Sequence, residues 1–146
     1  MNIMNPEDAL LCFIAEPGGP YQTDRIRVMK GMFLLAMGDD PNFRDVFDFQ
    51  PYAYGPFCAD IYHSLESLEA KGLITAQETP PKLQIEYRPT SRGISEAQAL
   101  VSALPPKARE VLQSTKRLVT TKGFSALLRF VYDRYPAYAT KSIARR

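Results

Sequence analysis

The chain has 146 residues, of which 45% are hydrophobic and 23% are charged, and these values are typical of a single globular domain. The longest dense apolar stretch, residues 32–37, is far shorter than the roughly 20 residues that a membrane-spanning helix needs, so we expect no membrane segment. The two cysteines, Cys12 and Cys58, fit neither a disulfide framework nor a zinc motif. The first residues lack the basic region of a signal peptide, and the sequence therefore predicts a cytoplasmic protein.

The net charge of +2 conceals an uneven distribution along the chain. Residues 1–104 contain 8 basic and 14 acidic residues, whereas residues 105–146 contain 10 basic and 2 acidic residues. Such an asymmetry indicates a polyanion or an acidic partner for the C-terminal part, or a basic helical end that neutralises an acidic body. Both interpretations stay open at this point.

The first predicted helix begins at Asn5 and Pro6. An asparagine side chain accepts hydrogen bonds from free N–H groups at a helix start, and proline is tolerated at the first helical position. The helix is expected over residues 7–16, because the Pro-Gly-Gly-Pro run at residues 17–20 is a strong helix breaker.

A second helix is predicted over residues 24–37, with Thr23 as its N-cap and Gly38 at its end. Its apolar residues surround most of the helix axis from Val28 onward. A helix that is apolar on most sides is buried, so this helix is expected to lie at the centre of the fold.

Residues 38–56 are predicted to form a loop that contains a short packed turn with the side chains Phe43, Val46, Phe47 and Phe49. A third helix is expected to follow Pro56 and to end at Gly72. One apolar stripe runs along it at helical spacing, made by Phe57, Ile61, Leu65 and Leu68.

Residues 73–77 and 83–89 predict two short strands joined by a turn, which together form a β-hairpin. Thr90 is expected to cap a fourth helix over residues 91–104, which the Pro-Pro pair after Leu104 ends. Two more helices, separated at Gly123 and closed by Pro136, are expected over residues 107–121 and 124–135. The predicted fold class is therefore mainly α with a small β-hairpin.

One stretch within this order is specific: the segment LESLEAKGLI, then the hairpin, then YRPTSRG. It resembles the winged-helix superfamily, in particular the MarR-like and PadR-like regulators. The resemblance implies a winged helix-turn-helix core over residues 23–104, with a C-terminal extension of basic helices over residues 105–146 that is used for dimerisation. The matching residues are Leu65, Leu68, Gly72, Leu73, Ile74, Tyr87, Thr90 and Gly93.

A second resemblance rests on the Tyr-Gly-Pro of residues 54–56, just ahead of a helix with spaced leucines. It is similar to Panacea-type antitoxins and to uncharacterised bacterial winged-helix families. It implies a protein-interaction module, either antitoxin-like or an adaptor component of a bacterial defence or toxin–antitoxin operon, without DNA binding.

In a winged helix the third predicted helix would enter the DNA major groove. Its outward face carries no arginine or lysine, and acidic residues lie on it and beside it. We therefore expect binding to double-stranded DNA to rely on the hairpin and the C-terminal basic groups, with few base contacts from the helix. The candidate DNA-binding residues are Tyr62, His63, Ser67, Lys71, Lys82, Arg88, Arg92, Lys116 and Arg117. The alternatives are a protein partner or a homodimer through the C-terminal helices.

The sequence predicts no catalytic or metal centre and no cofactor. His63 is the single histidine, so no nucleophile–base arrangement is proposed. Cys58 lies near a helix N-terminus, a position that can lower a thiol pKa, but a structural role is favoured. The loop acids are expected to be solvated, and they are Asp39, Asp40, Asp45 and Asp48.

The hexapeptide YAYGPF at residues 52–57 is either a hinge that starts a helix or an aromatic binding platform. Gly55 is expected to adopt an extended or positive-φ conformation before Pro56. Tyr52 and Tyr54 alternate with Ala53 and should point the same way. The hinge interpretation is favoured, with both tyrosines wedging the loop against the helices.

Overall fold

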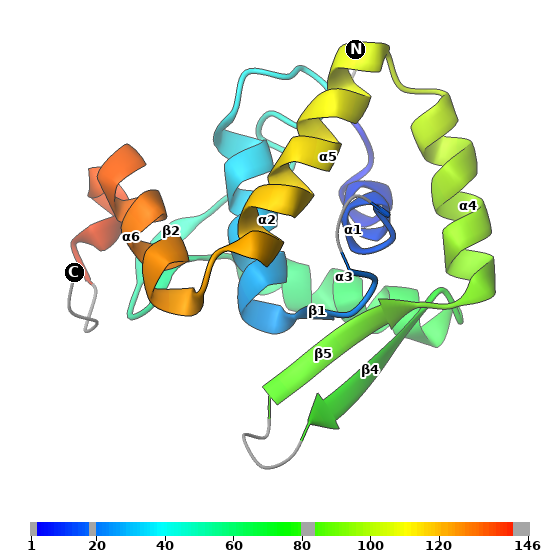
Figure 1. Cartoon of the computed structure of the whole chain (residues 1–146), viewed down its shortest axis with the longest axis horizontal. Helices are drawn as coiled ribbons and strands as arrows, with labels where there is room; N and C mark the ends of the chain where they lie inside the picture. The colour runs from blue at the N-terminus through cyan, green and yellow to red at the C-terminus, as the bar shows by residue number, and fades with distance from the viewer. Residues whose placement is uncertain (1–2, 18–19, 80–83, 142–146) are drawn as a thin grey trace.

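The computed structural model describes residues 3–17, 20–79 and 84–141, and its arrangement is shown in Figure 1. The helices are α1 (Pro6–Ile14), α2 (Arg25–Met37), α3 (Ala59–Ala70), α4 (Ser91–Ser102), α5 (Pro106–Thr121) and α6 (Phe124–Arg134), followed by the 3₁₀ helix η1 (Pro136–Ala139). The strands are β1 (Thr23–Asp24), β2 (Gln50–Tyr52), β3 (Gly55–Phe57), β4 (Ile74–Thr79) and β5 (Gln84–Pro89). The prediction of a mainly helical chain with a small antiparallel sheet is confirmed. None of the helices in these ranges has the length and apolar character needed to cross a membrane.

The β4–β5 hairpin projects from the helical body, as Figure 1 shows. The predicted hairpin is thereby confirmed. Strand β1 pairs with the other edge of β5, so the strand order is β1–β5–β4. Tyr87 on the central strand β5 therefore pairs with Thr23 on one side and Ala76 on the other. The prediction that Thr23 caps the second helix is wrong, because Thr23 belongs to this sheet and Asp24 accepts the 2.9 Å hydrogen bond from the Arg27 N–H.

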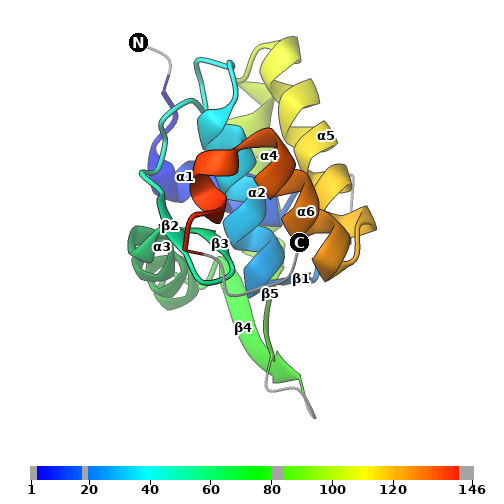
Figure 2. The same cartoon turned by 90° about the vertical axis from the view of Figure 1, so that its left-hand side faces the viewer.

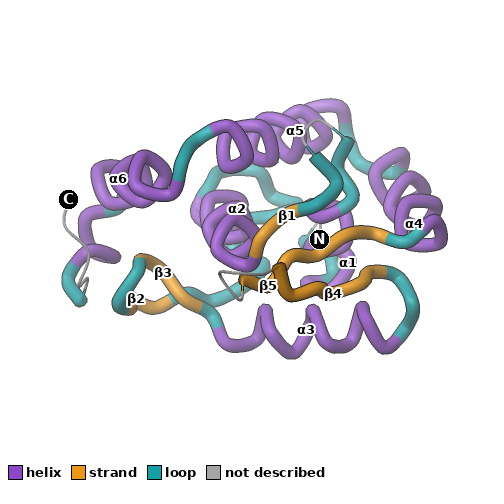
Figure 3. The backbone as a smooth tube through the Cα atoms, turned by 60° about the horizontal axis from the view of Figure 1, so that its bottom comes forward, coloured by secondary structure: helices purple, strands orange, loops and turns teal. Residues whose placement is uncertain are grey.

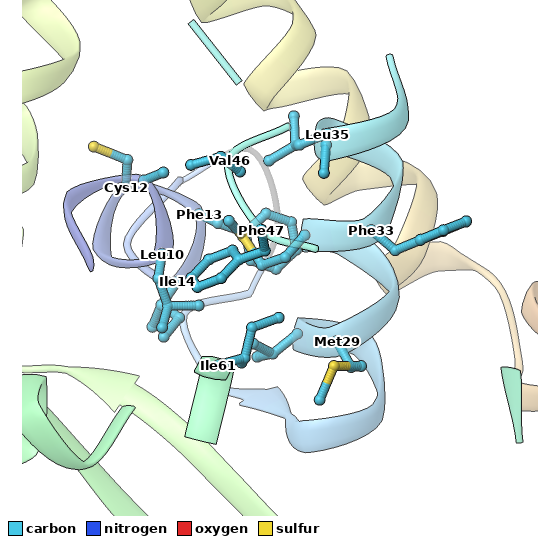
Figure 4. Close-up of a cluster of buried hydrophobic side chains, with 14 of the residues drawn as sticks. Leu10, Cys12, Phe13, Ile14, Met29, Phe33, Leu35, Val46, Phe47 and Ile61 are labelled. Carbon is cyan, nitrogen blue, oxygen red and sulfur yellow. The ribbon is translucent and has the colours of Figure 1, made fainter. Parts of the chain in front are cut away.

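Helix α2 lies at the centre, as predicted, with α1, α3 and α5 around it. Figure 4 shows side chains of α1, α2, the loop after α2 and α3 gathered in one interior, while Phe33 points from the other side of α2. There its ring meets the edges of Phe49 and Tyr135 at centroid distances of 5.3 and 5.1 Å. A Cβ at Gly31 would lie 2.2 Å from Cζ of Phe13, so glycine is required for α1 and α2 to pack this closely.

The loop after α2 packs down as predicted: Phe43, Val46 and Phe47 are buried. The remainder of the predicted loop is instead the short hairpin β2–β3, in which Tyr52 pairs with Gly55. As a result α3 begins at Ala59, with Cys58 as its N-cap, rather than directly after Pro56. The positive φ expected at Gly55 is confirmed at +104°.

Helix α5 is tied to the N-terminal half of the chain by two cations. Figure 2 shows α5 and α6 beside α2. The ammonium of Lys116 on α5 donates to the carbonyl oxygens of Phe13 and Ile14, each at 2.9 Å, and to that of Glu16 at 3.4 Å. Arg27 on α2 donates to the Val119 carbonyl at the end of α5 at 2.9 Å. Both cations thus add donors to backbone carbonyls at or just after a helix end, where intrahelical hydrogen bonds run out.

Candidate binding groove

The exposed face of α3 is acidic in the structure. His63 is exposed and its Nδ1 lies 4.0 Å from Oε1 of Glu66, and Asp60 and Glu69 are exposed as well. Ser67 is half-buried. Carboxylates on this face would repel a phosphate backbone, so the three predicted contacts Tyr62, His63 and Ser67 lie in an unfavourable field for DNA.

Several of the predicted basic contacts are engaged within the protein. Lys71 forms an ion pair with Glu7, and this hydrogen bond raises the pKa of Lys71. Arg88 is exposed and donates a 2.5 Å hydrogen bond to the side-chain oxygen of Gln22.

Lys116 is the clearest correction among the predicted DNA contacts. Its side chain is fully buried against the carbonyls at the end of α1, so it is not available to a phosphate. Arg92 and Arg117 are exposed, as a role in DNA binding would require. Lys82 lies outside the described residues.

A groove of about 590 Å³ opens between five elements, and we call it the aromatic groove. Its lining residues come from α2, the β2–β3 hairpin, α3, β5 and α6, and Figure 3 shows how these elements are arranged. The lining residues are Arg25, Ile26, Met29, Lys30, Tyr52, Tyr54, Gly55, Pro56, Phe57, Tyr62, Gln84, Ile85 and Phe124.

The aromatic side chains of the groove are in part open to solvent. Tyr52 and Tyr54 are 57% and 50% exposed, and Phe124 is 37% exposed. The Tyr52 ring lies 4.9 Å from that of Phe57, and Tyr54 lies 6.4 Å from Phe124, centroid to centroid. The expectation that both tyrosines wedge the loop against the helices is therefore wrong, because they stand out of the core. Gly55 does make the predicted turn, but the turn presents the tyrosines at the surface.

Arg25 is one of two cations in the groove. Its guanidinium lies 4.5 Å from the centroid of the Tyr62 ring, and its Nε donates a 2.9 Å hydrogen bond to the hydroxyl of Tyr87. Tyr62 also meets the Phe57 ring edge at 5.4 Å. The predicted DNA contact Tyr62 is thus part of a stacked set that holds α3 against α2 and β5.

Lys30 is the second cation of the groove, and its surroundings differ from those of Arg25. It is only 5% exposed, and its ammonium makes no hydrogen bond or ion pair within the described part of the chain. Burial lowers its pKa to about 8, with the charge of Asp24 opposing that effect. The Asp24 carboxylate is itself held by Arg27 at 2.5 Å. The lining set of the groove contains these two cations and no carboxylate.

Other reactive groups do not assemble into a site among the residues that the structure describes. Burial raises the pKa of the Cys58 thiol, which is opposite to activation at a helix N-terminus. Asp40 is buried, and its carboxylate accepts hydrogen bonds from the backbone N–H of Asn42 at 2.9 Å and from the Asn42 side-chain amide at 3.1 Å. The expectation that Asp40 is solvated is therefore wrong, because its carboxylate closes a turn. Within the described ranges, no group of three or more His, Cys, Asp or Glu side chains is placed to hold a metal ion.

Sequence reasoning identified the groove residues of the β2–β3 hairpin and missed those of α2. The sequence points to the aromatic residues at 52–57 as a candidate binding platform, but it assigns no role to Arg25 and Lys30. A signal was available, since the four groove residues of α2 are Arg25, Ile26, Met29 and Lys30, which share one face at helical spacing.

Comparison with models of known protein families gives no match for this chain, and no curated protein matches it.

Proposed function

We propose that the chain is a protein-interaction module built on a winged-helix fold, and that it binds a segment of a partner protein in the aromatic groove. The observation that carries this proposal is the exposure of Tyr52 and Tyr54 on the rim of a concave apolar site. Tyrosines that combine a large apolar ring with a polar tip are typical of protein interfaces. This is the antitoxin-like or adaptor role that the Tyr-Gly-Pro resemblance implies.

The winged-helix assignment is supported by the order of the elements. Helix α3 leads through Gly72, which has a φ of +75°, into the β4–β5 hairpin. Thr90 then accepts the Gly93 N–H at 3.0 Å at the start of α4. The short strand β1, just ahead of α2, pairs with the returning strand of the hairpin.

A protein partner fits the charges of the surface better than DNA does. Phosphate neutralisation by lysine and arginine supplies most non-specific DNA affinity. The exposed face of α3 carries Asp60, Glu66 and Glu69, Lys71 is paired with Glu7, and Lys116 is buried. Besides Lys71, the predicted basic contacts that stay exposed among the described residues are Arg88, Arg92 and Arg117, and none of them lies on α3.

The test is to select short random peptides on the full chain and to measure their affinities by fluorescence anisotropy. Tyr52→Ala and Tyr54→Ala should each weaken the selected peptides by about 5- to 30-fold, as expected for the loss of an interface anchor. Tyr21→Ala is the matched control, because Tyr21 is an exposed tyrosine outside the groove. Failure to select any peptide, or equal affinities in all three variants, would refute the proposal.

DNA binding remains the second candidate, and the projecting β4–β5 hairpin favours it. Exposed Arg88 lies on this hairpin and exposed Arg92 follows on α4. If DNA is bound, affinity should fall steeply with salt, and Arg88→Gln should reduce that dependence. A titration without binding at low salt removes this candidate.

Dimerisation through α5 and α6 also stays a prediction, which sedimentation of the full chain tests.

A further inference from the structure

The ammonium of Lys30 lies beside the turn of the β2–β3 hairpin. A Cβ at Gly55 would lie 3.1 Å from Cε and 3.2 Å from Nζ of Lys30, so the lysine tip is directly beside this glycine. Gly55 has no side chain to fill the space beside the ammonium, and both Gly55 and Lys30 line the groove. The charge is therefore buried from bulk water but faces the groove.

A lysine that is largely buried and makes no hydrogen bond within the described residues is costly, because the protein removes most of the water from the charge and returns no partner, leaving only what reaches Nζ from the groove. Such groups are normally paired with a carboxylate, and the described residues of the groove provide none. An anion that enters from outside would supply a partner. Since the walls are aromatic, that anion must be attached to an apolar group that packs on them.

The C-terminal tail of this chain does not have the required charge. After Ala139 it contains three basic residues and no acidic one, namely Lys141, Arg145 and Arg146. Charge complementarity therefore favours a different polypeptide with an acidic side chain as the occupant.

We propose that the partner segment carries an aspartate or glutamate whose carboxylate pairs with Lys30, next to an aromatic or aliphatic side chain that packs against Tyr52, Tyr54 and Phe124. This inference rests on the proposed function and specifies the chemistry of the partner. The apolar side chain supplies contact area, and the carboxylate supplies selectivity, because a neutral side chain leaves the ammonium buried and unpaired.

The experiment is a double-mutant cycle on the full chain with peptides selected as described above. For each selected peptide, the acidic residue is replaced by its amide, and both peptides are titrated against the wild type, Lys30→Met and Lys107→Met. Lys107 is an exposed lysine outside the groove and serves as the control. Circular dichroism and thermal unfolding establish that each variant is folded.

In the wild type and in Lys107→Met, replacing the acid by its amide should weaken binding by about tenfold or more, as expected for a hydrogen bond to a charged group. In Lys30→Met the same replacement should change affinity by less than about twofold. An undiminished acid preference in Lys30→Met overturns the inference.

Two further outcomes separate this inference from the proposed function. Selected peptides that lack acidic residues but lose affinity in Tyr52→Ala overturn the role of Lys30 and leave the protein-interaction function standing. Self-association of the wild-type chain that Lys30→Met abolishes would show that a second copy occupies the groove, and this too overturns the inference.

Discussion

Replacing Lys30 by methionine is expected to stabilise the free protein. Methionine has a similar length and fills the same space, but it brings no charge into a site where the ammonium has no partner among the described residues. Lowering the lysine pKa from 10.5 to about 8 corresponds to a cost of about 3 kcal/mol for the charged form. Lys30→Met removes that cost, so its free energy of unfolding at pH 7 should exceed that of the wild type by up to about 3 kcal/mol.

The pH dependence gives this prediction a second readout. Below pH 8 both the folded and the unfolded wild type hold the proton on Lys30, so the full cost is present. Between pH 8 and 10.5 the folded state releases the proton while the unfolded state retains it, and the Lys30 contribution therefore makes the wild type more stable as pH rises. The advantage of Lys30→Met should accordingly shrink across this range and be small above pH 10.5.

Urea unfolding followed by circular dichroism at pH 7, 9 and 10.5 measures both effects, and Lys107→Met supplies the baseline for an exposed lysine. An increase in the melting temperature of about 6–12 °C would accompany the full effect for a chain of this size. Reduced stability of Lys30→Met at pH 7 would refute the reasoning, since it would mean that the ammonium is well paired in the folded protein.

Burial lowers the pKa of Lys116 to about 8, as it does that of Lys30, but the Lys116 ammonium donates to three backbone carbonyls. Lys116→Met should therefore have the opposite sign and destabilise the chain by about 2–4 kcal/mol in urea unfolding, because the Ile14 carbonyl loses its donor and the Phe13 carbonyl is left with the Glu16 N–H; the neighbouring Arg117→Met should stay within about 0.5 kcal/mol. Gly93→Ala should prevent normal packing of α4, since its Cβ would lie 1.9 Å from the Leu73 carbonyl oxygen, and a loss of more than about 3 kcal/mol is expected by thermal unfolding. Thr90→Ala removes both the N-cap of α4 and a 2.7 Å hydrogen bond to a backbone carbonyl, so chemical unfolding should show a loss of about 1–2 kcal/mol; an unchanged midpoint would contradict the capping role.

Features that depend on a few neighbouring residues were predictable from the sequence. Asn5 caps α1 and Thr90 caps α4 as expected, and Gly55 has the positive φ that the turn requires. Each of these depends on local hydrogen bonding or on local steric limits, which the sequence displays directly.

Features that depend on distant segments were missed. Thr23 pairs with Tyr87 in the sheet, and the N-cap of α2 is the next residue, Asp24. The burial of Lys116 had one local indication: it shares the buried stripe of α5 with Ala108, Leu112 and Val119. Its acceptors on α1 lie about a hundred residues away, and no pattern within α5 identifies them.

The aromatic groove was equally hidden, because five elements contribute to it. The sequence shows aromatic residues at 52–57 and basic residues on α2, but their meeting depends on how β2–β3 folds over the helix. Exposure of the tyrosines likewise depends on what the rest of the chain leaves uncovered, and that is a property of the assembled fold.

The contact between Lys116 and the Phe13 carbonyl also constrains when the protein can finish folding. The two residues are 103 positions apart, so the carbonyl at the end of α1 has no Lys116 donor until 103 more residues have been synthesised. At a synthesis rate of about 5–20 residues per second, that interval is about 5–20 s. During it the apolar faces of α1 and α2 lack the cover of α5, so this part of the core stays incomplete until the C-terminal part emerges.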